Sequence, residues 1–233
     1  MMPAEPVVLD AAVLPLRTLN RALRVAIAEG RPVQIDQPGA RHNLGVAVLQ
    51  PGQLVVDGSV GYYCGAMADG PTITIKGSAG WAVGEGMLSG TIVVDGNAGN
   101  GAAASIRGGT VVVRGDCAAR AGIAMKGGLL LIGGDAGYMT GFMMQRGVIV
   151  ICGDAGEALA DSMYEGTIFV GGTVASLGND AVYAEITADD ERLLAGAFAL
   201  YGVPRPKALR KIVAGRKLWN FEKSEMATWR EAL

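Results

Sequence analysis

The stretch Gly134-Asp-Ala-Gly137-Tyr-Met-Thr-Gly141 decides the fold, because its first glycine belongs to a series with a fixed interval of 19 residues. No insertion interrupts the series, which indicates structural repeats of equal length. Repeats of this kind stack into a solenoid, in which each repeat packs on its neighbours. We call the members of the series anchor glycines: Gly58, Gly77, Gly96, Gly115, Gly134, Gly153 and Gly172.

The residues between the anchor glycines divide into strand-like runs and glycine-rich turns. Further glycines recur three, seven and thirteen residues after most anchors. A short run of β-branched or aliphatic residues stands before each anchor from Gly77 onward, and a run of this kind closed by glycine predicts a strand. The six runs are Thr72–Lys76, Thr91–Asp95, Thr110–Arg114, Leu129–Gly133, Val148–Cys152 and Thr167–Gly171.

A repeat of 19 residues fits one coil of a β-solenoid. It is too short for two packed helices, which need about 33 residues or more in the helical repeat families. Apolar residues in register between the glycines exclude a flexible linker. We therefore expect an all-β solenoid, a right-handed parallel β-helix of about seven coils, each with about three short strands. Equivalent residues would stack about 4.8 Å apart.

The apolar ends of a solenoid must be covered, and the flanking segments have suitable patterns. Residues 17–28 carry leucine and isoleucine at helical spacing, and Gly30 follows them. Thr187 and Asp190 resemble an N-cap pair and predict a second helix that ends near Gly202. We expect these two helices to cover the two ends.

Three parts are expected along the chain. Two segments before the repeats, Val33–Ile35 and Val46–Val48, predict lead-in strands. Beyond the second helix, Lys207–Phe221 is basic with aromatic residues; it is either a strap on the solenoid or a docking tail for another subunit, with Arg216, Trp219 and Phe221 as candidate contacts. The parts are residues 1–45, an N-terminal helix and lead-in strand; 46–184, the β-helix; and 185–233, a C-terminal helix and basic, aromatic tail.

Composition excludes several classes of protein. A net charge of −2 gives no basic field for nucleic acid. There is no run of about eighteen apolar residues and no signal peptide pattern, so a cytoplasmic location is expected. Cys64, Cys117 and Cys152 form no C-x-x-C pair, and we interpret them as buried structural thiols rather than a disulfide framework or iron–sulfur ligands.

Stacking turns each repeat position into a column of side chains, in which a site would stand out. The column one residue after the anchors, the turn column, holds residue types that cap turns. We interpret it as hydrogen bonding to the following backbone rather than a divalent-cation site. The position before the anchors alternates in sign and predicts a weak surface salt-bridge ladder of Asp57, Lys76, Asp95 and Arg114. The turn column is Ser59, Ser78, Asn97, Asp116, Asp135, Asp154 and Thr173.

Two further columns carry large side chains. Four residues after the anchors, the aromatic column contains Tyr62, Trp81 and Tyr138 among polar and small residues, which indicates an exposed face that a partner covers. Ten residues after the anchors, the methionine column predicts core filling, with a binding groove as the alternative. Its members are Met87, Ile106, Met125, Met144 and Met163, and Met67, Met139 and Met143 are nearby.

The residues show no catalytic constellation. His42, the single histidine, lies before the repeats, and we interpret it as a hydrogen-bonded structural residue rather than a general base. The glycine pattern recurs in every coil with no helix after it, unlike a dinucleotide-binding loop. No catalytic, cofactor-binding or metal-binding residue is therefore predicted in this chain.

The repeat resembles the C-terminal GXGXG β-helix domain of the glutamate synthase large subunit. The clearest copies are Gly58-Ser-Val-Gly61-Tyr-Tyr-Cys-Gly65, Gly77-Ser-Ala-Gly80-Trp-Ala-Val-Gly84 and Gly134-Asp-Ala-Gly137-Tyr-Met-Thr-Gly141. As a separate polypeptide, the chain looks like the stand-alone, GlxC-like subunits of split glutamate-synthase-like enzymes, most of all the GlxC-like polypeptide of N-methylglutamate synthase. The tail Gly215-Arg-Lys-Leu-Trp-Asn-Phe221 adds to this likeness.

The resemblance implies a non-catalytic scaffold. In those enzymes a glutamine-amidotransferase-like subunit works with a subunit that carries FMN and iron–sulfur clusters, and the β-helix holds the two together. N-methylglutamate synthase converts methylamine and glutamate into N-methylglutamate and ammonia. The family motif consists of structural glycines, so the resemblance implies no catalytic residue in this chain.

Three alternatives stay open at this point. A similar repeat occurs in the β-helix polypeptide of formylmethanofuran dehydrogenase and in that of the formyltransferase/hydrolase complex, where it would also be a scaffold. A structural repeat protein without an enzyme partner is the second. A β-helix enzyme acting on polysaccharide is the least favoured, because no coil is broken by a long loop and no acids cluster.

Overall fold

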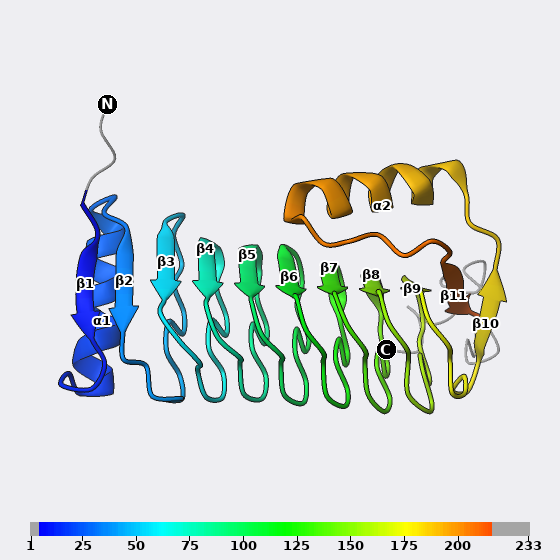
Figure 1. Cartoon of the computed structure of the whole chain (residues 1–233), viewed down its shortest axis with the longest axis horizontal. Helices are drawn as coiled ribbons and strands as arrows, with labels where there is room; N and C mark the ends of the chain where they lie inside the picture. The colour runs from blue at the N-terminus through cyan, green and yellow to red at the C-terminus, as the bar shows by residue number, and fades with distance from the viewer. Residues whose placement is uncertain (1–4, 216–233) are drawn as a thin grey trace, which may run out of the picture.

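The computed structural model describes residues 5–215, which form one β-solenoid (Figure 1). Coils stack along the long axis, and one strand of each coil joins a single sheet of 11 strands. The strands are β1 (Val7–Asp10), β2 (Val33–Asp36), β3 (Gln53–Val56), β4 (Asp69–Ile75), β5 (Ser89–Val94), β6 (Thr110–Val113), β7 (Lys126–Ile132), β8 (Arg146–Ile151), β9 (Thr167–Val170), β10 (Ala181–Ala184) and β11 (Arg210–Ala214).

Paired residues in neighbouring strands of the repeats are 19 residues apart, which is the interval between the anchor glycines. Thr91 pairs with Thr110, and Thr110 pairs with Leu129, each 19 residues on. Strands β1 to β9 are parallel throughout. The expected solenoid of about seven coils is therefore confirmed, and each of the six strand-like runs, apart from its last residue, lies in one of the strands β4 to β9.

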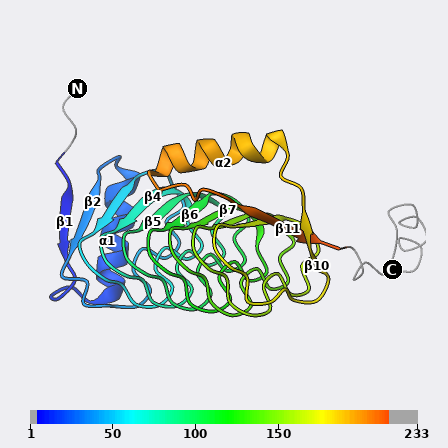
Figure 2. The same cartoon turned by 45° about the vertical axis from the view of Figure 1, so that its right-hand side comes forward.

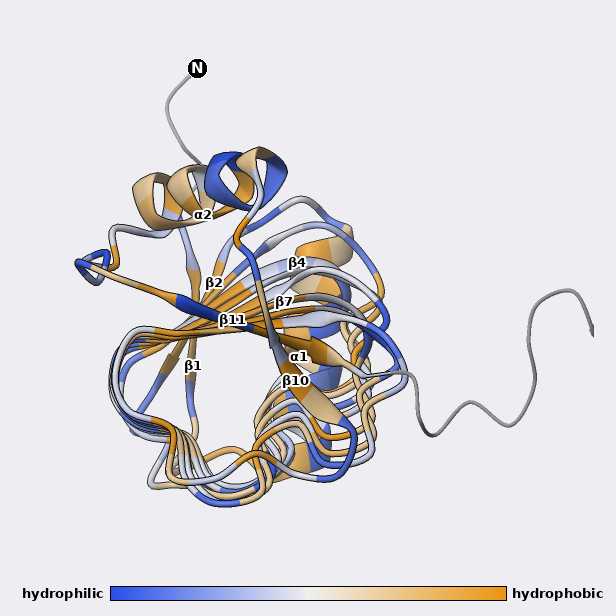
Figure 3. Ribbon diagram, turned by 90° about the vertical axis from the view of Figure 1, so that its right-hand side faces the viewer, coloured by the Kyte–Doolittle hydropathy of each residue, from blue (hydrophilic) through white to orange (hydrophobic). Residues whose placement is uncertain are grey.

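Each coil has one strand, not the expected three. Viewed down the axis, the strands form one flat side and the rest of the coil is a rounded arc (Figure 3). Two residues after each anchor, a single-residue bridge such as Ala98 to Cys117 joins neighbouring coils. The arc that follows alternates in and out of left-handed backbone, as at Arg120, Gly122 and Ala124 with φ of 60°, 67° and 51°. Alternation of this kind bends the chain too sharply for a strand.

The inside of the coils is apolar. Methionine-column residues are fully buried, as expected, and they face the inward side chains of the strands. The inward strand column is Ile73, Ile92, Val111, Leu130, Ile149 and Ile168, each with no exposed surface. Burial of this ladder is the main stabilising contribution along the solenoid.

Helix α1 (Leu16–Ala28) covers the N-terminal end, as expected (Figure 2). Its Leu19, Leu23 and Ile27 are buried in the same core as the coils. Asn20 is buried but satisfied, because its Nδ2 donates to the Asn43 carbonyl oxygen (2.8 Å) and its Oδ1 accepts from the Gly45 N–H (2.9 Å). This pair of hydrogen bonds fixes the helix on the first coil.

Helix α2 (Ala188–Tyr201) begins where expected but does not cover the C-terminal end. It runs back over the outer face of the sheet above β9 to β6 (Figure 1). Leu194 and Phe198 pack on a second apolar cluster that includes Leu131 and Phe169 of the strands. The outer side chains of β6 to β9 are apolar. Burying them under α2 offsets the cost of leaving the C-terminal end of the solenoid uncovered by this helix.

Strands β11 and β10 finish the sheet at the C-terminal end. β11 pairs antiparallel with β9 and with β10, so the described part of the basic segment is a strand of this domain. Lys211 Nζ lies 2.6 Å from Asp190 Oδ2 and ties β11 to the first turn of α2. Arg216, Trp219 and Phe221 lie outside the described residues. The expected strand at Val46–Val48 is wrong: this segment lies in the arc of the first coil, with Ala47 at a φ of 53°.

Candidate interaction surface on the arc

Three rings stack along the outside of the first coils. The ring centroids of His42 and Tyr62 are 4.3 Å apart and those of Tyr62 and Trp81 are 5.0 Å apart, with nearly parallel planes. Tyr62 N–H also donates to His42 Nδ1 (2.8 Å), the hydrogen bond expected of a structural histidine. Trp81 remains 52% exposed. The stack is therefore an ordered apolar surface that is accessible to solvent.

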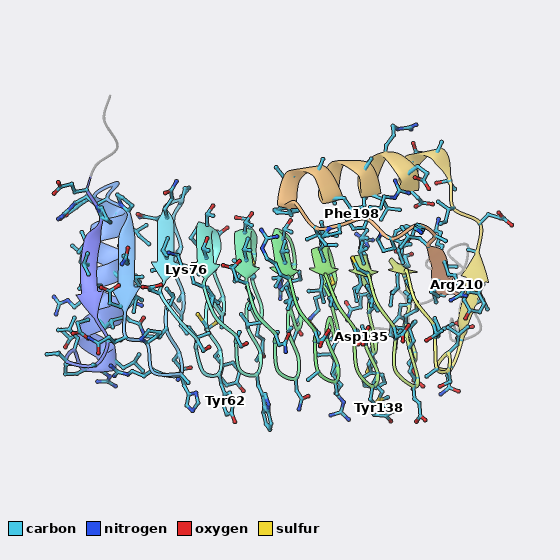
Figure 4. The ribbon with its side chains drawn as sticks, viewed as in Figure 1. Tyr62, Lys76, Asp135, Tyr138, Phe198 and Arg210 are labelled. Atoms are coloured by element: carbon cyan, nitrogen blue, oxygen red, sulfur yellow. The ribbon has the colours of Figure 1, made fainter. Side chains whose placement is uncertain are left out.

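Tyr138 lies apart from this stack. It projects from the same edge of the coils as Tyr62 (Figure 4), but Asn100 and Ala119 occupy the two coils between it and Trp81. The structure thus brings two of the three predicted aromatic residues together. The repeat spacing does not place His42 with them, because it precedes Tyr62 by 20 residues rather than 19.

More exposed apolar side chains lie on the same arc. Tyr63 and Met67 lie on the coil of Tyr62, Leu88 lies on the coil of Trp81, and Met143 lies on the coil of Tyr138. The side chain of Met67, for example, is 54% exposed. Core filling, expected for the methionines near the methionine column, is wrong for Met67 and Met143, which are exposed. Tyr63 and Leu88 were not predicted; exposed side chains on neighbouring coils are the signal that could have found them. Together with the stack they give the arc several exposed apolar side chains on neighbouring coils.

The turn column is a continuous hydrogen-bond ladder between coils. From Ser59 to Asp154, each side-chain oxygen accepts from the backbone N–H one coil further on, as when Asp116 Oδ1 accepts from the Asp135 N–H (2.8 Å) and Asp135 Oδ1 accepts from the Asp154 N–H (2.7 Å). The predicted partner, the backbone that follows in the same turn, is therefore wrong. The next coil provides the donor because its N–H stands directly above the side chain.

This ladder explains the anchor glycines from Gly77 onward, whereas Gly58 has a φ of 139° and a Cβ there would meet Pro38. A Cβ on Gly134 would lie 2.0 Å from Asp116 Oδ1, and a Cβ on Gly153 would lie 2.0 Å from Asp135 Oδ1. Neither glycine has a positive φ, so the requirement is steric rather than conformational. The carboxylate of one coil occupies the space that a side chain on the next anchor would need.

Acid should weaken the ladder at Asp154. The Thr173 backbone N–H (2.6 Å) and hydroxyl both donate to Asp154, and they hold the pKa of its carboxyl below the ordinary value of 3.8. The folded chain thus binds this proton less tightly than the unfolded chain, so the stabilisation is complete above pH 3.8 and is lost as the pH falls through the lowered pKa. We expect Asp154→Asn to reduce the loss of melting temperature between about pH 5 and pH 2.

An amide can replace that carboxylate, since Asn97 Oδ1 accepts from Asp116 in the same column (2.9 Å). Melting curves followed by circular dichroism at each pH provide the measurement, and Glu29→Gln is the control at an exposed carboxyl. An Asp154→Asn protein as sensitive to acid as the wild type would contradict the assignment.

The charged column does not form a continuous ladder. Asp57 pairs with Lys76 at 4.0 Å and Asp95 pairs with Arg114 at 3.1 Å, as two separate and exposed pairs. Exposed pairs of this kind contribute little to the stability of the fold.

Within residues 5–215, no three His, Cys, Asp or Glu side chains come together as a metal site.

The cysteines are free thiols. Cys64 and Cys117 are buried and Cys152 is half-buried, as predicted for structural residues. Burial raises the pKa of Cys64 to about 12 and that of Cys152 to about 11, and it raises the pKa of Cys117 further. None of the three is activated as a thiolate.

An open groove at the C-terminal end is lined by Thr173, Val174, Tyr183 and Arg210. Arg210 donates to the Gly172 carbonyl oxygen (2.5 Å), which holds its guanidinium on the last coil.

Neither of the described helices is long and apolar enough to cross a membrane.

Comparison with known proteins finds similarity to a curated protein in sequence and to a solved complex in structure. No protein-family model matches the chain. Protein GlxC of Rhizobium meliloti (strain 1021) is 42% identical over 71 residues, which are 29% of this chain and 31% of the length of Protein GlxC.

A chain of the formyltransferase/hydrolase complex FhcABCD from Methylorubrum extorquens, solved with methylofuran, superimposes with a TM-score of 0.67. The likeness covers 86% of both chains at 24% sequence identity. At this identity the likeness establishes the β-solenoid fold alone.

Proposed function

We propose that this chain is a non-catalytic scaffold subunit of a multi-subunit enzyme complex. The observation that carries the proposal is the ordered, exposed stack of His42, Tyr62 and Trp81 on an otherwise regular solenoid. Stacked rings at the surface present a rigid apolar area at low entropic cost, which suits a protein interface. Coils of constant length offer no long loop on which an active site could be built.

The complex is proposed to be glutamate-synthase-like, of the N-methylglutamate synthase type. Support comes from the glycine repeat and from the similarity to Protein GlxC over 71 residues. In this proposal the chain holds a glutamine-amidotransferase-like subunit against a subunit with FMN and iron–sulfur clusters, in the cytoplasm. The complex converts methylamine and glutamate into N-methylglutamate and ammonia.

A second candidate is a scaffold in a complex that handles formyl groups. The structural likeness to a chain of the FhcABCD complex, over 86% of this chain, favours it. Both candidates give the chain the same role and differ in its partners.

Co-expression with the products of the neighbouring reading frames tests both. We expect the chain to co-purify with a glutamine-amidotransferase-like product and an FMN-containing product, and the assembly to form N-methylglutamate from methylamine and glutamate. Removal of this chain should abolish the assembly. Co-purification with an amidohydrolase-like product and formyl transfer would favour the second candidate, and flavin-dependent turnover by this chain alone would refute the scaffold role.

A further inference from the structure

On two adjacent coils, residues 96–133, positions of the arc that hold aromatic side chains in neighbouring coils hold small ones. In the aromatic column, Trp81 is followed by Asn100 and Ala119 before the column rises again at Tyr138. Backbone hydrogen bonds keep these coils in register, since Gly101 donates to the Ala119 carbonyl oxygen (3.0 Å). The change in side-chain size is thus a step in the surface.

A second column shows the step on the Tyr138 side. Nine residues after the anchors, Gly86 on the coil of Trp81 is followed by Ser105 and Ala124 on these two coils, and then by Met143 on the coil of Tyr138. Ser105 donates through its N–H to the Ile123 carbonyl oxygen (2.8 Å), so these coils are also in register. We call the low area made by Asn100, Ser105, Ala119 and Ala124 the central shelf.

The width of the shelf matches an α-helix. Trp81 and Tyr138 are separated by three coil steps, about 14 Å at about 4.8 Å per step. Ring thickness leaves about 10 Å between their facing surfaces. An α-helix with its side chains is about 10–12 Å across, so a helix lying along the coil direction would contact both rings and the small residues beneath it.

The charged side chains without a salt bridge on the two coils of the shelf are mostly positive. Arg107 and Arg120 lie on the arc and Lys126 is the first residue of β7, and within residues 5–215 none of the three makes a salt bridge. The carboxylate of the same coils, Asp116, lies in the turn column and accepts from the Asp135 N–H (2.8 Å). Like charges on neighbouring coils repel, and an acidic partner would relieve that repulsion.

We propose that the central shelf seats an acidic α-helix of a partner subunit, between the rings of Trp81 and Tyr138. Apolar side chains of the helix contact the two rings, and its carboxylates pair with Arg107 and Arg120. The role of the shelf rests on the proposed function, because it names the contact that the scaffold offers to a partner.

Two variants test the shelf in the complex with the products of the neighbouring reading frames. Ala119→Trp fills the shelf, and the double variant Arg107→Glu/Arg120→Glu reverses its charge. We expect each to weaken binding by about tenfold or more, measured by calorimetry. Wild-type binding should weaken as salt rises from about 0.05 to about 0.5 M, and binding by the charge-reversal variant should not.

Matched controls separate these effects from general damage. Glu157→Trp puts a ring in the same column beyond Tyr138, and Arg31→Glu/Lys207→Glu reverses two exposed charges elsewhere. Both should bind as the wild type does. Thermal melting establishes that Ala119→Trp is folded, and tryptophan already occupies this column at Trp81.

The failure of the shelf is distinguishable from that of the proposed function. A complex that forms equally well with the shelf variants overturns the shelf and leaves the scaffold role intact. If no complex forms with either neighbouring product, the proposed function fails, and a photo-crosslinking residue at position 119 in the native host decides the shelf. An adduct with an acidic helical segment of another protein supports it; no adduct, or an adduct with a second copy of this chain, overturns it.

Discussion

Gly134→Ala should lower the free energy of unfolding by about 3 kcal/mol, the upper range for overpacking by one methyl group. The added Cβ would lie 2.0 Å from Asp116 Oδ1. That oxygen cannot move away without losing its hydrogen bond from Asp135 (2.8 Å). The backbone cannot move either, because a coil lies on each side. Urea titration followed by circular dichroism provides the measurement.

The same substitution in α2 is the control and should have the opposite sign. Gly196 lies in the middle of the helix, and a Cβ there would meet nothing within 4 Å. Gly196→Ala should stabilise the protein by about 0.5–1 kcal/mol, through helix propensity. A second test removes the obstructing carboxylate: in the Asp116→Ala background, Gly134→Ala should cost about 1 kcal/mol, because the next nearest group is the Gly115 carbonyl carbon at 3.1 Å. Additive costs would show that the clash is not with Asp116.

The parts of the fold that the sequence predicts are those set by local, repeated contacts. The anchor glycines determine the coil length, and the register of Thr91 with Thr110 follows from it. The capping box of Thr187 and Asp190 is equally local, and it forms as expected. In each case the residues that specify the feature lie within one turn or one coil of it.

The parts that were wrong depend on contacts across the molecule. Arg120 and Ala124 have left-handed backbone although neither residue type favours it, because the neighbouring coils impose the path. Helix α2 has a pattern compatible with covering an end. Its position is determined by the apolar outer column under it, which strands far apart in the chain provide. The ring stack was missed in part because His42 joins it across an irregular first coil.

Phe169→Ala should lower the free energy of unfolding by about 3–5 kcal/mol and loosen α2 from the sheet. Phe169 is 1% exposed on the outer face of β9, in the cluster that holds Leu194 and Phe198 of the helix. Truncation leaves a cavity that strand pairing on both sides of β9 prevents from closing. Amide hydrogen exchange should become faster in α2 first, while the buried thiol of Cys117 inside the coils stays unreactive toward a thiol reagent.

Leu200→Ala is the control on the opposite face of α2, where Leu200 is 74% exposed, and it should change stability by less than about 0.5 kcal/mol. The pair therefore compares the side chain of the sheet that lies under α2 with an exposed side chain of the helix itself. If Phe169→Ala left exchange in α2 unchanged, the helix would be held by its first turn, through the Lys211 and Asp190 pair, and not by the outer face of the sheet. If both variants were equally destabilising, the exposed face of α2 would itself be an interface, and α2 rather than the arc would become the first surface to test for a partner.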